Sequence, residues 1–186
     1  MPEKDPDFMN VLAVDPNIIV DLKYATSDNF THQVIYDFTT AVARTGTVKK
    51  LGIASRLLYD QGYRLKIWDA FRPVTAQAKL FSVVSDPMWV AEPNPNYSHQ
   101  KGVTFDLTLT DLNGHEVEMQ SAFDDFTGKA KRSAPRTAIQ EANYQRLDQA
   151  MTQAGFVGYA NEWWDYRDTD MDTYGPKQTD PNLYQL

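Results

Sequence analysis

The clearest alternation of apolar and polar positions lies in the stretch GVTFDLTLTDLNGHEVEM, residues 102–119. Its apolar positions are Val103, Phe105, Leu107 and Leu109. A period of two is typical of a strand with one face in the core, so Thr104 and Asp106 are predicted to lie on the opposite face. The dipeptide Asn113-Gly114 favours a two-residue turn. The stretch is therefore predicted to form a β-hairpin.

Three other stretches are predicted to be helices. VKKLGIASRLLYDQG (residues 48–62) has apolar residues at helical spacing, with Gly62 placed as the C′ residue. TAQAKLFSVV (75–84) is the second helix, and RTAIQEANYQRLDQAMTQAG (136–155) is the third, ending at Gly155. Glycine is favoured at such an end because it adopts the left-handed conformation without steric cost.

The remaining apolar runs predict extended segments. NIIVDLKYA (17–25) and YRLKIWDA (63–70) are predicted strands, and FVGYANEWWDYR (156–167) is predicted to return as an extended segment. The tail after Asp168 is polar and is expected to be irregular. Mixed strands and helices with one antiparallel hairpin predict an α+β fold, a small single domain (1–186) with a central antiparallel sheet flanked by helices.

Composition narrows the classes of partner and of metal ligand. The chain has 186 residues, a net charge of -7 and no cysteine. The negative charge argues against a nucleic-acid or anionic-membrane partner, and the lack of cysteine excludes disulfides and thiolate ligands. Neither MPEKDPDFMN nor any later stretch has the apolar run of a signal peptide or a membrane span. A soluble, cytoplasmic protein is expected.

His99 and Asp106 are the first candidates for a chemical site. Gly102 lies between them and allows the chain to bend where a loop enters the predicted strand. Imidazole and carboxylate ligands together suit zinc or a similar divalent ion. The alternative is that Asp106 belongs to an ordinary polar strand face that meets water.

The acids of EWWD, residues 162–165, are the second candidates. Glu162 and Asp165 would lie on opposite faces of a regular strand, so joint action requires a turn or bulge between them. The alternative is that Trp163 and Trp164 pack in the core while the two acids meet water.

Arg72 is the third candidate, because it follows a predicted strand in WDAFRP and precedes a proline that restricts its backbone. An arginine there could clamp an anion or oxyanion, or it could be a surface charge or salt-bridge partner. The other two histidines, His32 and His115, are expected in loops.

Five stretches stand in this order along the chain: DLKYATSDNF, IWDAFRP, HQKGVTFDLTL, MQSAFDDF and EWWD. Together they resemble the D-alanyl-D-alanine dipeptidases, the VanX-type branch of the M15 zinc peptidases. The family pattern near the metal is S-x-H-x-x-G-x-A-x-D, followed much later by E-x-x-H. Here the first motif spans residues 97–106 and the second spans residues 162–165. The resemblance implies an M15/hedgehog-like zinc peptidase fold.

Carried over residue by residue, the resemblance also implies a set of roles. It makes His99, Asp106 and Asp165 the ligands of one zinc ion. Glu162 matches the family's general acid/base, and Arg72 matches its transition-state arginine.

The substrate-binding residues implied by the resemblance are Asp124, Tyr24 and Tyr97. Asp124 matches an acid that holds the substrate's free ammonium group, and the adjacent Asp125 is the competing choice. Tyr24 and Tyr97 lie in stretches that match the surroundings of the family's active site.

Three positions depart from the family pattern. Asp165 stands where the pattern has histidine, Thr104 where it has alanine, and Tyr97 where it has the first serine. Two carboxylate ligands would neutralise a divalent ion and make it a weaker Lewis acid. Harder metals such as manganese therefore become candidates beside zinc.

The activity implied by the resemblance is zinc-dependent hydrolysis of D-alanyl-D-alanine, a small dipeptide substrate, in peptidoglycan precursor metabolism. Two alternatives remain open. One is a catalytically silent binding protein with the dipeptidase fold, motivated by the changes at Asp165 and Tyr97. The other is a D,D-carboxypeptidase that acts on longer cell-wall peptides.

Overall fold

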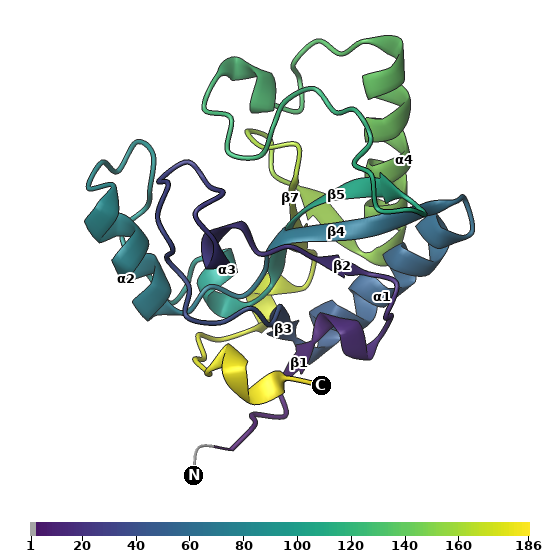
Figure 1. Cartoon of the computed structure of the whole chain (residues 1–186). Coiled ribbons are helices and arrows are strands. Elements are labelled where there is room, and N and C mark those ends of the chain that lie inside the picture. The colour runs from purple at the N-terminus through teal and green to yellow at the C-terminus, as the bar shows by residue number, and fades with distance from the viewer. Residues whose placement is uncertain (1–2) are drawn as a thin grey trace.

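The computed structural model describes residues 3–186 and contains a five-stranded mixed sheet (Figure 1). In spatial order its strands are β2 (Ile19–Val20), β4 (Tyr63–Asp69), β5 (Thr104–Asp111), β7 (Asp165–Asp168) and β6 (Phe156–Gly158). β2 runs parallel to β4, and the other neighbours are antiparallel. A separate two-stranded antiparallel sheet joins β1 (Phe8–Asn10) and β3 (Val42–Arg44).

Two long helices, α1 (Thr45–Tyr59) and α4 (Ala138–Ala154), pack against each other and against the sheet (Figure 1). A capping box at Thr137 begins α4, and Gly155, with φ of 99°, ends it as predicted. The remaining helices are α2 (Val74–Val83), α3 (Ser98–Lys101) and five 3-10 turns: η1 (Val11–Ala13), η2 (Lys23–Ala25), η3 (Gly128–Ala130), η4 (Met171–Thr173) and η5 (Pro181–Tyr184). Within the described residues, none of these helices has both the length and the apolar character needed to cross a bilayer.

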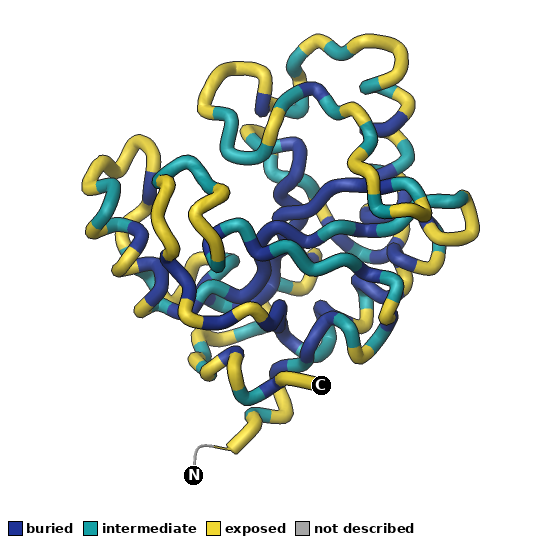
Figure 2. Tube along the Cα trace, in the orientation of Figure 1, coloured by how far each residue is buried: buried dark blue, intermediate teal, exposed yellow. Residues whose placement is uncertain are grey.

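β5 is buried along almost its whole length (Figure 2), so the alternative in which Asp106 lies on a strand face that meets water is wrong. Its apolar side chains, such as Phe105, belong to the hydrophobic core that also contains residues of α1 and α4. The polar side chains of the opposite face are Thr104, Asp106, Thr108 and Thr110, and each is at most 4% exposed. Aromatic side chains pack near that face: the ring centre of Phe123 lies 5.0 Å from that of Trp68 and 5.5 Å from that of Trp164.

The predicted hairpin is only half formed. The Asn113-Gly114 turn is present, with Gly114 at φ of 89°, but the returning segment makes one isolated bridge, from Glu116 to Thr110. β4 pairs along one edge of β5, and β7 pairs only with Thr104–Asp106 at the start of the other. The returning segment meets the rest of that edge, where the Val117 amide donates to the Leu109 carbonyl at 3.1 Å, but it forms no regular strand.

Two other predicted boundaries shift. The strand predicted over residues 17–25 is only the two-residue β2, and the chain then turns into η2. The first predicted helix ends at Tyr59, so Gly62, with φ of 88°, lies in the turn that follows and not at C′.

Strand β7 is fastened to α1 through a buried acid. Asp168 is wholly buried and accepts a hydrogen bond of 2.6 Å from the Thr47 hydroxyl. It also forms an ion pair with Lys50. Because alternate residues of a strand face opposite sides, Asp168 and Tyr166 point toward the core while Asp165 and Arg167 share the other side.

We predict that Gly102→Ala destabilises the fold more than Gly62→Ala. Both glycines have positive φ, but a Cβ at Gly102 would lie 3.0 Å from Phe8 Cε1 and 3.3 Å from Phe71 Cδ2, whereas at Gly62 it would meet nothing within 4 Å. Strain plus crowding should cost about 2–4 kcal/mol at Gly102, against about 1 kcal/mol of strain alone at Gly62. Chemical denaturation measures both, and equal losses would contradict the packing argument.

Candidate metal centre

Two buried carboxylates face each other across adjacent strands. In the antiparallel β5–β7 pair, Asp106 lies directly opposite Asp165, and the two are 4% and 3% exposed. Like charges directly opposite each other destabilise a sheet, and burial increases the cost of each charge. A cation beside this pair would relieve both costs.

A turn between β6 and β7 brings Glu162 to the same place. The Glu162 amide donates to the Tyr159 carbonyl at 3.2 Å, and the Tyr159 amide donates to the Asp165 carbonyl at 3.0 Å. Carboxylate oxygens of Asp106, Glu162 and Asp165 lie within 4.8 Å of one another. The turn that joint action of Glu162 and Asp165 required is therefore present.

The alternative for EWWD is partly correct. Trp163 and Trp164 do pack in the core, and the Trp163 indole donates to the Ser121 hydroxyl at 2.9 Å. Asp165 does not meet water, however, because it is itself buried. The paired tryptophans anchor the segment and leave Glu162, which precedes them, at the edge of a cavity.

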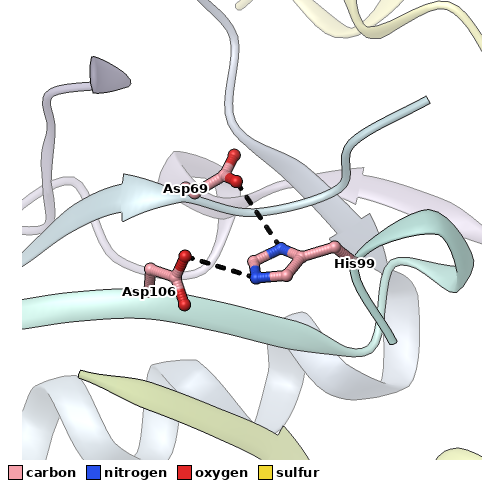
Figure 3. Close-up of side chains that lie close together, drawn as sticks. All are labelled: Asp69, His99 and Asp106. Atoms are coloured by element: carbon pink, nitrogen blue, oxygen red, sulfur yellow. Dashed lines mark ion pairs between the residues drawn. The ribbon is translucent and has the colours of Figure 1, made fainter. Parts of the chain in front are cut away.

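His99 presents one ring nitrogen to Asp106 (Figure 3). It lies on the single-turn helix α3, which Gly102 ends with φ of 75°. Its Nδ1 is 2.8 Å from the Ala70 carbonyl, which can only accept, so Nδ1 carries the hydrogen. Nε2 is then free to act as a metal ligand and lies 3.3 Å from Asp106 Oδ2. A carbonyl behind a histidine in this way is usual at metal sites.

Asp69 is a part of the site that the sequence did not reveal. It ends β4 next to Asp106, is wholly buried, and lies 3.7 Å from His99 Nδ1 (Figure 3). Its Oδ1 accepts from the Tyr36 hydroxyl at 2.6 Å, and its Oδ2 pairs with the Arg72 guanidinium. The available signal was an acid at the end of a buried strand, three residues before Arg72.

Arg72 points into the site and is fixed there from several directions. Its Nη1 donates to Gln77 Oε1 at 2.7 Å, its Nε donates to the Tyr36 hydroxyl at 3.1 Å, and its guanidinium lies 5.2 Å from the centre of the Tyr24 ring. Because Arg72 pairs with Asp69, the salt-bridge alternative is also correct. The pair holds the guanidinium in one orientation at the cavity.

Asp124 and Tyr24 meet at the other end of the cavity. Asp124 has φ of 53°, and the Tyr24 hydroxyl donates to its Oδ2 at 2.5 Å. Tyr97 is 48% exposed at the margin. The cavity has a volume of about 220 Å³. All the site residues chosen from the sequence line it: Tyr24, Arg72, Tyr97, His99, Asp106, Asp124, Glu162 and Asp165.

Comparison with known proteins gives this arrangement its context. The family model described as D-ala-D-ala dipeptidase (Peptidase_M15) matches residues 4–180. The chain belongs to the D-ala-D-ala dipeptidase family. It is 30% identical over 161 residues to the D-alanyl-D-alanine dipeptidase of Escherichia coli, covering 86% of this chain and 83% of that protein. It is 32% identical over 174 residues to the D-alanyl-D-alanine dipeptidase of Enterococcus faecium, covering 78% and 83%.

The charge of the site in this family member calls for a cation. Burial, together with the nearby carboxylates of Asp106 and Asp165, raises the pKa of Glu162 to about 8, and burial raises the pKa of Asp124 to about 7. Burial disfavours the charged form of His99, but the Asp106 carboxylate overrides this and raises the pKa of His99 to about 9. Each raised pKa favours the protonated form of the group, because the negative charge of the carboxylates exceeds the positive charge of the nearby residues.

A divalent metal fits the residues that are present. Asp106 Oδ1 is buried and has no hydrogen-bond partner among residues 3–186, although an ionised carboxylate accepts several. Asp106 belongs to two compact groups of potential ligands: Asp69–His99–Asp106 and Asp106–Glu162–Asp165. Asp106 is therefore common to both groups, and the predicted ligand His99 belongs to one while the predicted ligand Asp165 belongs to the other.

We predict that Asp106→Asn weakens binding of a divalent metal ion by at least about 100-fold, because Asp106 joins both groups of ligands. Wild-type protein should retain one ion per chain after dialysis, as measured by elemental analysis, with affinities measured by isothermal titration calorimetry.

Asp111→Asn is the matched control on the same strand. Asp111 Oδ1 accepts from the amides of Asn113 and His115, and asparagine keeps such an acceptor. Equal metal affinities for Asp106→Asn and wild type would exclude Asp106 as a ligand.

Proposed function

We propose that this protein is a metal-dependent dipeptidase that hydrolyses D-alanyl-D-alanine in peptidoglycan precursor metabolism in the cytoplasm. The observation that carries the proposal is the meeting, in one small cavity, of Glu162, the fixed guanidinium of Arg72 and Asp106, whose Oδ1 has no hydrogen-bond partner among residues 3–186. A ligand set, a proton carrier and a fixed cation are the components that hydrolysis of an amide requires. Family membership supplies the reaction, and the D,D-dipeptide comes from the named relatives.

The proposed metal ligands are His99, Asp106 and Asp165. One imidazole with carboxylates suits zinc, and the second carboxylate also suits manganese. When bound, such an ion would polarise the scissile carbonyl and lower the pKa of water. The Ala70 carbonyl contributes by fixing the His99 tautomer that leaves Nε2 free to bind metal.

Glu162 is the proposed proton carrier. Its carboxylate lies within reach of the Asp106 and Asp165 oxygens yet borders the cavity, so water and substrate can approach it. Glu162 takes a proton from the attacking water and delivers it to the leaving amine. Its turn position allows this, because the side chain is not part of the β5–β7 pairing.

Arg72 is the proposed stabiliser of the oxyanion that forms when the carbonyl becomes tetrahedral. Its bonds to Asp69, Tyr36 and Gln77 fix the guanidinium before substrate arrives. A donor that needs no reorganisation stabilises developing charge more effectively than a mobile one.

Asp124, supported by Tyr24, is the proposed site for the substrate's free ammonium group. The cavity of about 220 Å³ is smaller than the ~300–1,000 Å³ typical of drug-sized ligands. Near Asp124, Phe126 packs 5.0 Å from Phe30 and 4.7 Å from Trp89, and all three rings line the cavity. A small cavity with an acid in its lining supports a short, unblocked peptide over a longer cell-wall peptide.

The test is D-alanyl-D-alanine hydrolysis by wild type and Glu162→Gln, each with and without a chelator. We expect the substitution to lower kcat by about 10²–10⁴-fold while metal remains bound, and the chelator to abolish wild-type turnover. Equal rates in all four conditions would favour a silent binding protein. Faster hydrolysis of a blocked tripeptide than of the dipeptide would favour a D,D-carboxypeptidase.

We predict that Asp124→Asn raises the KM for D-alanyl-D-alanine by about 10–100-fold, because a buried ammonium would lose its counter-ion. The variant should also discriminate less against N-acetyl-D-alanyl-D-alanine, as measured by kcat/KM for both substrates. The neighbouring acid, which does not line the cavity, provides the control: Asp125→Asn should leave the KM and the discrimination between the two substrates near wild type. If the two variants behave alike, the ammonium site is misassigned.

A further inference from the structure

Arg167 holds the carboxylate that replaces the family's histidine. It lies two residues after Asp165 on the same side of β7, with Nε 3.1 Å from Asp165 Oδ1 and Nη2 3.4 Å from Oδ2. The Thr104 hydroxyl, across the strand pair, lies 3.3 Å from the same Oδ1. The guanidinium also lies 4.2 Å from the centre of the Tyr159 ring and borders the cavity.

The charges of these two residues cancel. A neutral imidazole at residue 165 would add no charge to the site, whereas the Asp165 carboxylate adds one negative charge beside Asp106 and Glu162. Arg167 adds one positive charge in contact with that carboxylate. The other guanidinium of the cavity, Arg72, is paired with the buried Asp69 instead.

We propose that Arg167 is the charge partner of Asp165, so that the two residues together take the electrostatic place of one neutral ligand. The inference rests on the metal site proposed above and adds a positioning residue to it. Arg167 holds both oxygens of Asp165 on one side, because each carboxylate oxygen has a second lone pair for a further partner. It also limits how much negative charge the site presents when no metal is bound.

Removing the guanidinium has opposite effects on the metal-free and metal-bound protein. Without metal, the Asp165 carboxylate would face Asp106 across the strand pair with no guanidinium in contact with it, which lowers thermal stability. With metal, the loss of a nearby positive charge strengthens attraction of the ion. Thr104 still contacts Asp165 Oδ1, so the ligand keeps one of its supports.

The experiment compares wild type, Arg167→Gln, Asp165→His and the double variant. In chelator, Arg167→Gln should lower the Tm by roughly 2–6 °C, and saturating zinc should remove most of that difference. The zinc dissociation constant, measured by competition with a chelating indicator, should fall about tenfold.

In the Asp165→His background, Arg167→Gln should change the Tm and the zinc dissociation constant little. The partly exposed arginine then has no carboxylate at residue 165 to pair with, and its side chain can turn toward solvent. Equal effects of Arg167→Gln in both backgrounds, or no effect in either, would overturn the proposal.

Two further variants guard against a purely structural role. Arg167→Lys keeps the charge and should restore most of the wild-type Tm and dissociation constant, even if Asp165→His folds poorly. Arg64→Gln is the control on β4, where the Arg64 side chain donates to the Asn17 carbonyl at 2.7 Å and faces no metal ligand. Zinc should not rescue any stability that this control loses, and a rescue equal to that of Arg167→Gln would contradict the assigned role.

Failure of this inference is distinguishable from failure of the proposed function. Stoichiometric zinc in wild type, lost in Asp106→Asn, establishes the metal site whatever Arg167 does. If wild type binds no metal, the proposed function and the tuning role both fall.

Discussion

The site depends on the electrostatic repulsion between Asp106 and Asp165, which neighbouring positive charges and hydrogen-bond donors must offset. Pairing β5 with β7 sets Asp106 against Asp165 at the border of the cavity, where each is at most 4% exposed and water screens the two charges little. Ion pairs and hydrogen bonds stabilise two of the nearby carboxylates. Asp69 pairs with Arg72 and accepts a hydrogen bond from Tyr36. Asp165 pairs with Arg167 and accepts a hydrogen bond from Thr104. One oxygen of Asp106 is left over among the described residues, and it marks the place for a cation.

The site combines rigid and adaptable supports. Asp69 and Asp106 come from neighbouring strands, so hydrogen bonds of the sheet fix their separation. His99 and Glu162 come instead from a single-turn helix and a turn, which the Ala70 carbonyl and the buried Trp163 hold in place. This division suits chemistry that requires both fixed ligands and a mobile proton, because Glu162, the proposed proton carrier, is outside the sheet pairing.

Sequence alone predicted the local features that depend on nearby residues. The alternation in β5 and the glycine that ends α4 follow from periodicity and backbone preference. Every site residue that the resemblance to the dipeptidases selected lines one cavity. Local patterns do not report long-range contacts: the segment predicted to be extended over residues 156–167 is split by a turn, and the predicted second hairpin strand forms only one bridge to β5.

The same limit explains the residues that were missed. Asp69 lies in the stretch IWDAFRP but was not singled out there, and Arg167 lies outside the five stretches, so the importance of both arises from contacts made in three dimensions. The buried polar face of β5 was likewise invisible, because its cover comes from aromatic side chains such as Phe123 that are distant in sequence.

The buried contacts of Asp168 with α1 connect strand β7, which carries Asp165, to the helix on the other side of the sheet. One side of β7 carries Asp165 toward the cavity, while the other side inserts Asp168 between Thr47 and Lys50. Only two residues separate these acids along a short strand, so the strand that carries Asp165 is fixed on its other side to α1. Helix α1 lines no part of the cavity, yet through Asp168 it contributes to the position of a carboxylate that does.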